Sequence, residues 1–172
     1  MEKEKVLLNA TLCFLVRNRR VILAIKADKI GKGCWNGYGG GIEDGELIRK
    51  AAARELNQES EEVVVAFEDL IPAAIVDFHN TKSDGETFVC RVYVYLAYKW
   101  SGEPKETREM LNPTEFDIDN LPFENMMLAD KEWLPPVLNG EKIIASAEYG
   151  PWQKELLGPV KIKRVEEFSE NF

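Results

Sequence analysis

Cysteine pairs, long apolar runs and an excess of positive charge are all missing from this chain of 172 residues. The three cysteines form no CxxC pair and no metal-ligand spacing, and their odd number fits reduced thiols better than a disulfide framework. No run approaches the length of about 18 apolar residues that a membrane-spanning helix needs. The charged start MEKEK is followed by no apolar segment typical of a signal peptide. We therefore predict a cytoplasmic protein that makes no membrane contact.

The charge balance is acidic, with 30 Asp and Glu against 22 Lys and Arg and a formal net charge of −8. This balance argues against broad binding to a polyanion, so no nucleic-acid polymer is expected as a partner. A single nucleotide remains compatible, because Mg²⁺ and a few local cations can neutralise its phosphates. The length and the ordinary composition predict one domain over residues 1–172, as a monomer or homodimer.

Alternating apolar patterns occupy much of the chain and predict its secondary structure. We expect strands at residues 6–16, 21–25, 63–67, 73–79, 87–99, 115–118, 142–147 and 160–165. One helix is expected after Gly45, with Asp44 as its N-cap. A second is expected over residues 124–138, ending at Pro135 and Pro136. This order predicts an α/β fold, an α/β/α sandwich with a mixed sheet between helices.

The most informative segment is WNGYGGGIEDGELIRKAAARELNQESE, residues 35–61. Six glycines fall between Gly31 and Gly41, which is too dense for the interior of a strand or helix. Glycines in such a turn allow the backbone to adopt positive φ and to pass close to a ligand. The residues that follow are rich in strong helix formers. A glycine-rich turn that leads into an acidic helix suits a metal-bound diphosphate.

On that helix, Glu55 and Glu59 lie one turn apart on the stripe that also carries Ile48 and Ala52. Two carboxylates on an inward face cost desolvation energy unless a cation pairs with them. Mg²⁺ is a suitable partner because it binds carboxylate oxygens together with water and substrate phosphates. A solvated acidic face is the alternative interpretation. The adjoining glycine turn favours the metal site.

The same segment resembles the Nudix box, G-x5-E-x7-R-E-U-x-E-E-x-G-U, in which U is a bulky aliphatic residue. The positions that match are Gly40, Glu46, Arg54, Glu55, Leu56 and Glu59. Gln58 stands where the pattern has Glu, so we expect weaker metal binding or fewer bound ions. Glu61 stands where the pattern has Gly, so we expect the helix end to differ from the family norm.

The resemblance implies that water attacks phosphorus in a nucleoside diphosphate derivative, with Mg²⁺ or Mn²⁺ as the cofactor. It also implies that the metal ligands are Glu55, Glu59, Glu109 and the Gly40 carbonyl. Glu55 is the first candidate for the base that activates water, and Glu109 or Glu106 is the second. We expect Arg54 to orient Glu55 or to pair with Glu46.

From about residue 7 to about residue 133 the chain resembles the MutT-type branch, which hydrolyses oxidised purine nucleoside triphosphates. In that branch an aromatic residue and two Asp bind the base, and here Met127, Ala129 and Asp130 occupy those positions. A buried, protonated Asp130 could donate a hydrogen bond to a carbonyl of an oxidised purine. The predicted substrate-binding residues are Lys26, Asn36, Gly39, Gly40, Phe78, Met127 and Asp130.

Three hypotheses for function follow. The first is Mg²⁺-dependent hydrolysis of nucleoside triphosphates, oxidised purines among them, to the monophosphate and pyrophosphate. The second is the same chemistry on ADP-ribose, a dinucleoside polyphosphate or an ordinary dNTP. The third is a non-catalytic, Nudix-like nucleotide-binding module. Gln58 and Glu61 support the third, and the retained carboxylates at the metal positions argue against it.

Overall fold

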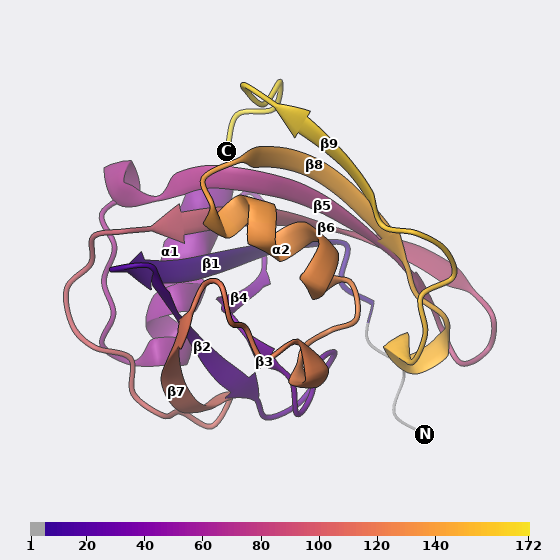
Figure 1. Ribbon diagram of the computed structural model, residues 1–172, viewed down its shortest axis with the longest axis horizontal. Helices are drawn as coiled ribbons and strands as arrows, with labels where there is room; N and C mark the ends of the chain where they lie inside the picture. The colour runs from indigo at the N-terminus through magenta and orange to yellow at the C-terminus, as the bar shows by residue number, and fades with distance from the viewer. Residues whose placement is uncertain (1–5) are drawn as a thin grey trace.

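A mixed β-sheet runs through the protein, with one helix on each face (Figure 1). The structure, a computed structural model, describes residues 6–172. In chain order the elements are β1 (Asn9–Arg17), β2 (Arg20–Lys26), β3 (Trp35–Asn36), β4 (Tyr38–Gly41), α1 (Ile48–Ser60), the short 3₁₀ turn η1 (Phe67–Asp69), β5 (Ile71–Thr81), β6 (Thr87–Ala97), β7 (Met110–Asp117), η2 (Phe123–Asn125), α2 (Asp130–Leu138), β8 (Lys142–Glu148), η3 (Pro151–Gln153) and β9 (Lys161–Val165). The predicted α/β sandwich with a mixed sheet is confirmed.

The main path of the sheet has the order β3-β2-β1-β6-β5-β8-β9, while β4 pairs with β1 and β7 with β2. The β1–β6 and β5–β8 pairs are parallel, and the other pairs are antiparallel. Two strands share one edge of β1, because residues 15–17 pair with β2 and residues 10–13 pair with β4. The glycine-rich segment is therefore held directly against β1.

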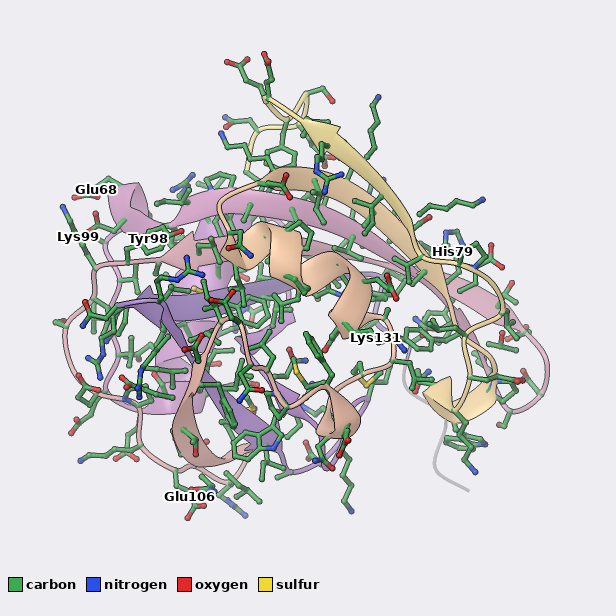
Figure 2. All side chains as sticks on the ribbon, in the orientation of Figure 1. Glu68, His79, Tyr98, Lys99, Glu106 and Lys131 are labelled. Carbon is green, nitrogen blue, oxygen red and sulfur yellow. The ribbon has the colours of Figure 1, made fainter. Side chains whose placement is uncertain are left out.

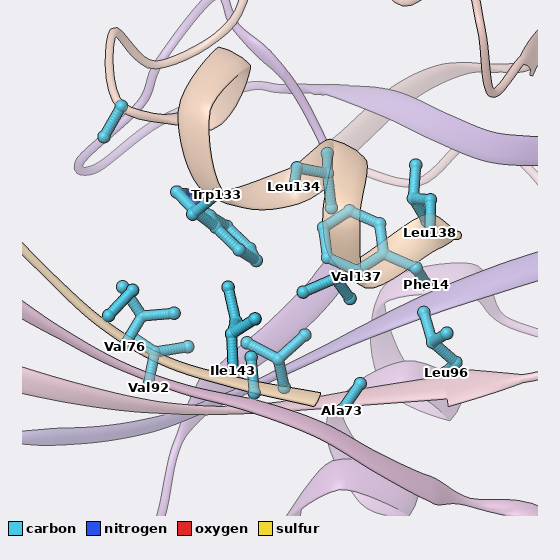
Figure 3. Close-up of a cluster of buried hydrophobic side chains, with 14 of the residues drawn as sticks. Phe14, Ala73, Val76, Val92, Leu96, Trp133, Leu134, Val137, Leu138 and Ile143 are labelled. Carbon is cyan, nitrogen blue, oxygen red and sulfur yellow. The ribbon is translucent and has the colours of Figure 1, made fainter. Parts of the chain in front are cut away.

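Each helix buries one hydrophobic cluster against the sheet. Under α2, the indole of Trp133 is almost fully buried and meets the Phe14 ring edge-on, with 6.2 Å between centroids (Figure 3). Under α1, Leu56 and Tyr95 are completely buried. The helices are thus fixed by apolar contacts, and the polar side chains of α1 that reach the sheet must find partners within the fold.

Strand β6 contributes to both clusters because its side chains alternate between the two faces. Val92 and Val94 belong to the cluster under α2, and Tyr93 and Tyr95 to the cluster under α1. Both sides of the strand are therefore covered by apolar side chains.

Most predicted strands are confirmed within a few residues, but residues 63–67 are not a strand. Within that segment only Val64 pairs, through an isolated bridge to Ser101, and η1 follows at Phe67. One residue pair cannot extend into a ladder here because the chain turns into η1. Strand β7 is longer than predicted, since it pairs with β2 from Met110 onward.

Both ends of α1 differ from the sequence expectation. Asp44 is not the N-cap, because the Glu46 N–H bonds to the Glu43 carbonyl in an additional turn and the helix begins only at Ile48, with no side-chain cap. At the other end, Glu61 takes a φ of 70° and donates its N–H to the Asn57 carbonyl at 2.8 Å. The helix therefore stops with a positive-φ residue although glycine is absent.

The second helix begins later than predicted and ends at residue 138, the predicted bound. Residues 123–125 form the separate turn η2, and α2 starts at Asp130. Pro135 and Pro136 lie inside α2 rather than ending it. Their carbonyls still accept hydrogen bonds, at 3.1 Å from the Asn139 N–H and 3.0 Å from the Glu141 N–H.

Among residues 6–172, no helix is long and apolar enough to cross a membrane. The assignment of residues 1–172 to one domain stays a prediction.

Candidate active site

Glycine is required in β4 because the strand touches its neighbours at backbone distance. A Cβ built at Gly39 would lie 1.9 Å from the Thr11 carbonyl oxygen, and one at Gly40 would lie 2.5 Å from Glu55 Oε2. Neither glycine has a positive φ, so close approach alone explains them. The expectation that this segment is unsuited to a strand is wrong: it is a strand that only glycine can form at this spacing.

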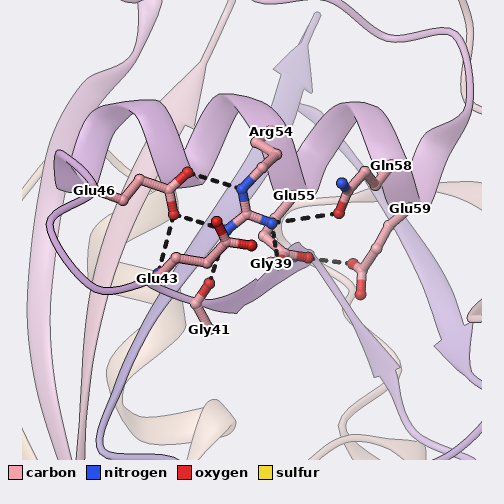
Figure 4. Close-up of polar contacts among 8 residues, drawn as sticks. All are labelled: Gly39, Gly41, Glu43, Glu46, Arg54, Glu55, Gln58 and Glu59. Atoms are coloured by element: carbon pink, nitrogen blue, oxygen red, sulfur yellow. Dashed lines mark hydrogen bonds and ion pairs between the residues drawn. The ribbon is translucent and has the colours of Figure 1, made fainter.

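Arg54 is the centre of a polar network between α1 and the loop that precedes it (Figure 4). Its guanidinium donates two hydrogen bonds to Glu46, both at 2.8 Å, and one to Glu55 Oε1 at 2.8 Å. Further contacts reach Gln58 Oε1 at 3.3 Å and the Gly41 carbonyl at 3.0 Å. Arg54 holds the pKa of Glu46 down at about 2. Both roles that the sequence left as alternatives, orienting Glu55 and pairing with Glu46, are present.

Glu59 is the most buried carboxylate of the helix, with 6% of its surface exposed. Its Oε2 accepts the Gly39 N–H at 3.0 Å, so the glycine strand fixes its position. Burial raises the pKa of Glu59 to about 8, against the lowering effects of that hydrogen bond and of the Lys26 ammonium. Glu55 and Glu109 add to the rise through their charge. A bound cation would relieve the cost of ionising this side chain.

The free carboxylate oxygens fit a divalent cation. Glu55 Oε2 and Glu59 Oε1 receive no hydrogen bond from residues 6–172, and hard oxygen donors of this type suit Mg²⁺ or Mn²⁺. Glu109 precedes β7 and is exposed, with its carbonyl bonded to the Ala27 N–H at 2.9 Å. Across that described part of the chain no three His, Cys, Asp or Glu side chains are gathered closely enough to hold a metal. The structure therefore does not bring the expected ligand set together.

A cavity of about 150 Å³ joins this region to the underside of α2. Its lining includes Glu59 and all seven predicted substrate-binding residues: Lys26, Asn36, Gly39, Gly40, Phe78, Met127 and Asp130. Asn36 Oδ1 accepts the Gly37 N–H at 2.8 Å, which leaves the side-chain NH₂ group to donate. The phosphate-binding and base-binding candidates therefore face one continuous space.

Asp130 is buried at the far end of this cavity, with 4% of its surface exposed. Its Oδ1 accepts the Trp133 indole N–H at 3.1 Å. Burial raises the pKa of Asp130 to about 7, against the lowering effect of that hydrogen bond. The direction of this shift agrees with the hypothesis that the carboxyl group can be protonated.

The alternative base Glu106 lies away from the cavity. Its side chain is exposed at the edge of the molecule, where Oε1 accepts the Asn112 N–H at 3.0 Å (Figure 2). Glu55 does not line the cavity itself, but it is the better placed of the two, because its carboxylate lies against Gly40, which does.

Four polar or aromatic residues that line the cavity were not among the predicted site residues: Thr11, Asn80, Trp133 and Tyr149. Thr11 is the lone hydroxyl in the apolar run of β1, and Asn80 stands on the core-facing parity of β5 together with Phe78. Both polar residues interrupt an apolar strand pattern, so the sequence contained a signal for them. Trp133 packs in the core as expected and also lines the cavity. Tyr149 follows β8 and carried no signal, because only the sheet pairing brings it here.

Known proteins resemble this chain over most of its length. The model of the NUDIX domain family matches residues 6–137. An oxidized purine nucleoside triphosphate hydrolase of Danio rerio is 37% identical over 136 residues, which cover 78% of this chain and 81% of the relative. The protein of that name from Mus musculus is 32% identical over 132 residues, covering 77% and 80%.

The fold has a counterpart among solved structures. A crystal structure of a mutator MutT protein from Bacillus halodurans matches with a TM-score of 0.74 and 24% identity, over 91% of this chain and 97% of that chain. This likeness concerns the architecture.

Proposed function

The chain belongs to the NUDIX domain family of hydrolases, and from that premise we propose that it cleaves purine nucleoside triphosphates, oxidised purines among them, to the monophosphate and pyrophosphate. The family generally uses a divalent metal, and we propose Mg²⁺, with Mn²⁺ as a substitute. The observation that carries the proposal is the single cavity shared by Glu59, the glycine strand and Asp130. A nucleotide bound there would have its phosphates at α1 and its base under α2.

Each residue at the phosphate end would have a distinct role. Glu59 and Glu55 would hold the metal through their free oxygens, with Glu109 and the Gly40 carbonyl completing the protein ligands. The metal would neutralise the phosphoryl oxygens when bound. Lys26, whose charge acts on Glu59, would neutralise phosphate charge from the opposite wall. Arg54 would keep Glu55 in place.

The chemistry then needs one water and one base. The water oxygen forms a bond to phosphorus, the bond between phosphorus and the leaving phosphate oxygen breaks, and a carboxylate accepts the water proton. The base would be whichever carboxylate is left outside the metal's ligand shell. Glu55 is the first candidate, because Arg54 fixes one of its oxygens and leaves the other free beside Gly40. Glu109 is the second.

The test is a substrate panel with Mg²⁺ and with Mn²⁺. It compares oxidised dGTP, dGTP, dATP, dCTP, ADP-ribose and a diadenosine polyphosphate by kcat/KM, with pyrophosphate and monophosphate measured as products. The proposal expects the highest kcat/KM on a purine triphosphate with pyrophosphate released. A higher value on ADP-ribose or the dinucleotide would replace the substrate class. Nucleotide binding without any turnover would indicate a non-catalytic module.

A further inference from the structure

Tyr149 closes the end of the cavity beneath α2 and is fixed by β5. Its side chain is 1% exposed and lines the cavity. The Tyr149 N–H donates to the His79 carbonyl at 2.8 Å, and its carbonyl accepts the Thr81 hydroxyl at 3.0 Å. The ring packs on Phe78, with 6.2 Å between centroids. Contacts on both sides of the residue therefore hold the hydroxyl in one place.

The Tyr149 hydroxyl is only half satisfied. It accepts the Ala129 N–H at 2.8 Å, and a phenolic hydroxyl has one proton of its own to donate. No acceptor within residues 6–172 receives that proton. A buried donor without a partner is costly, so an acceptor on a bound ligand would recover the lost hydrogen bond.

Position 129 gives this hydroxyl its significance. The MutT-type resemblance places an Asp there, whereas this chain has alanine, whose methyl group can neither donate nor accept. The Tyr149 hydroxyl lies against the backbone of that residue, and the charge of Asp130 acts on it. A neutral donor therefore stands beside the one carboxyl group that remains at this end.

We propose that Tyr149 determines base specificity, its hydroxyl donating a hydrogen bond to an acceptor atom of the purine, either an exocyclic carbonyl oxygen or a ring nitrogen, next to the contact made by Asp130. This inference rests on the proposed function and goes beyond it. A neutral hydroxyl selects a base by the presence of an acceptor, whatever the charge of that base.

The test measures binding, so it needs no turnover. The Kd of each deoxynucleoside monophosphate is measured by calorimetry for the wild type, for Tyr149→Phe and for Tyr95→Phe. The ligands are oxidised dGMP, which has an added C8 carbonyl and an N7–H in place of the N7 acceptor, dGMP itself, its 7-deaza analogue, which lacks the N7 acceptor, and the 2-aminopurine analogue, which lacks the C6 carbonyl. Tyr95→Phe is the matched control. The Tyr95 hydroxyl is also buried with a proton that no acceptor within residues 6–172 receives, but it lies under α1.

We expect Tyr149→Phe to weaken binding by about 5- to 10-fold for ligands that carry the recognised acceptor. Binding of the ligand that lacks it should stay unchanged, and Tyr95→Phe should change none of them. Equal Kd values for Tyr149→Phe and the wild type on every ligand would overturn the proposal, as would a uniform loss on all of them.

Folding of the variant does not limit the test. If Tyr149→Phe unfolds, 3-fluorotyrosine at position 149 keeps the ring and makes a stronger donor. It should tighten binding only of ligands with the acceptor, and no change would overturn the proposal. The proposed function has its own test: it fails if the substrate panel shows no turnover of purine triphosphates. The Kd values test the role of Tyr149 independently of that result.

Discussion

The two ends of the cavity satisfy their polar groups in different ways. Beside α1, the Arg54 guanidinium contacts acceptors on four residues. Beneath α2, the Tyr149 hydroxyl accepts the Ala129 N–H, and no acceptor within residues 6–172 receives its own proton. A saturated network holds one geometry, whereas unsatisfied donors and acceptors leave hydrogen bonds for a ligand.

This difference separates chemistry from recognition within one site. The α1 end presents preorganised carboxylates, as hydrolysis of a charged phosphate requires. The α2 end presents a mostly apolar space with few polar groups, as base binding requires. Substitutions at the first end should change the rate on every substrate equally, and those at the second should change the ranking of bases.

Glu59→Gln should abolish the chemistry most completely. We expect Mg²⁺-dependent pyrophosphate release to fall at least about 10³-fold, because a metal-binding carboxylate is lost. The fold should persist, since the amide oxygen can still accept the Gly39 N–H. Thermal unfolding monitors the fold, and Glu61→Gln, an exposed change at the helix end, is the control. Full activity of Glu59→Gln would contradict the assignment.

Arg54→Lys should lower kcat/KM by about 10- to 100-fold without altering the ranking of bases. An ammonium group cannot make the two-pronged contact to Glu46 and still hold Glu55. Arg91→Lys is the matched control, because Arg91 makes a similar paired contact to Asp77 away from the cavity. If Arg54→Lys changed the ranking of bases, it would contradict the assignment of separate roles to the two ends of the cavity.

Asp130→Asn should change how stability depends on pH. The pKa of Asp130 rises from 3.8 to about 7 in the folded protein, so the folded state retains a proton that the unfolded state has lost. Its contribution to the free energy of unfolding is present below pH 4 and disappears as the pH rises to 7. The wild type should therefore lose roughly 3 to 4 kcal/mol relative to the variant over this window.

Denaturant unfolding at pH 4, 5.5 and 7 measures this difference. Glu132→Gln, an exposed change on the same helix, should show the pH dependence of the wild type. Parallel curves for the wild type and Asp130→Asn would show that the carboxyl group does not titrate in this range.

Gln58→Glu should have the smallest effect. The added carboxylate would lie near the candidate metal ligands and contact Arg54 from an exposed position. We expect the Mg²⁺ concentration for half-maximal activity to fall by about 2- to 5-fold, because exposed charges interact weakly. A metal titration of activity checks this, with the ranking of bases unchanged. An unaltered titration would mean that position 58 has no influence on the metal.

Periodicity predicted the parts of the fold that depend on local pattern. The alternating strands and α1 were readable because one side chain in two, or one stripe in 3.6, faces the core. Strand β4 was not readable, since its shape depends on Thr11 and Glu55, which are remote in sequence and fill the space beside it. The late start of α2 depends similarly on how residues 123–129 pack against the core.

The site residues also divide into those that a local sequence pattern predicted and those that depend on the tertiary structure. Residues predicted from the box and its flanks, such as Asn36 and Asp130, do line one cavity. Tyr149 could not be predicted, because it reaches the cavity through the parallel pairing of β5 with β8. Local motifs thus identify most of the cavity lining, whereas Tyr149 is identified only by the tertiary structure.

The parallel pairing of β1 with β6 also affects how the molecule forms. It joins Asn9 to Arg91, so the centre of the sheet closes only after a long stretch of chain is available. Contacts of such sequence separation slow folding, because loop-closure entropy is lost before the contact forms. During synthesis from the N-terminus, helix α1 would be complete well before the sheet that buries it. We expect α1 to be stabilised late, when β6 pairs with β1.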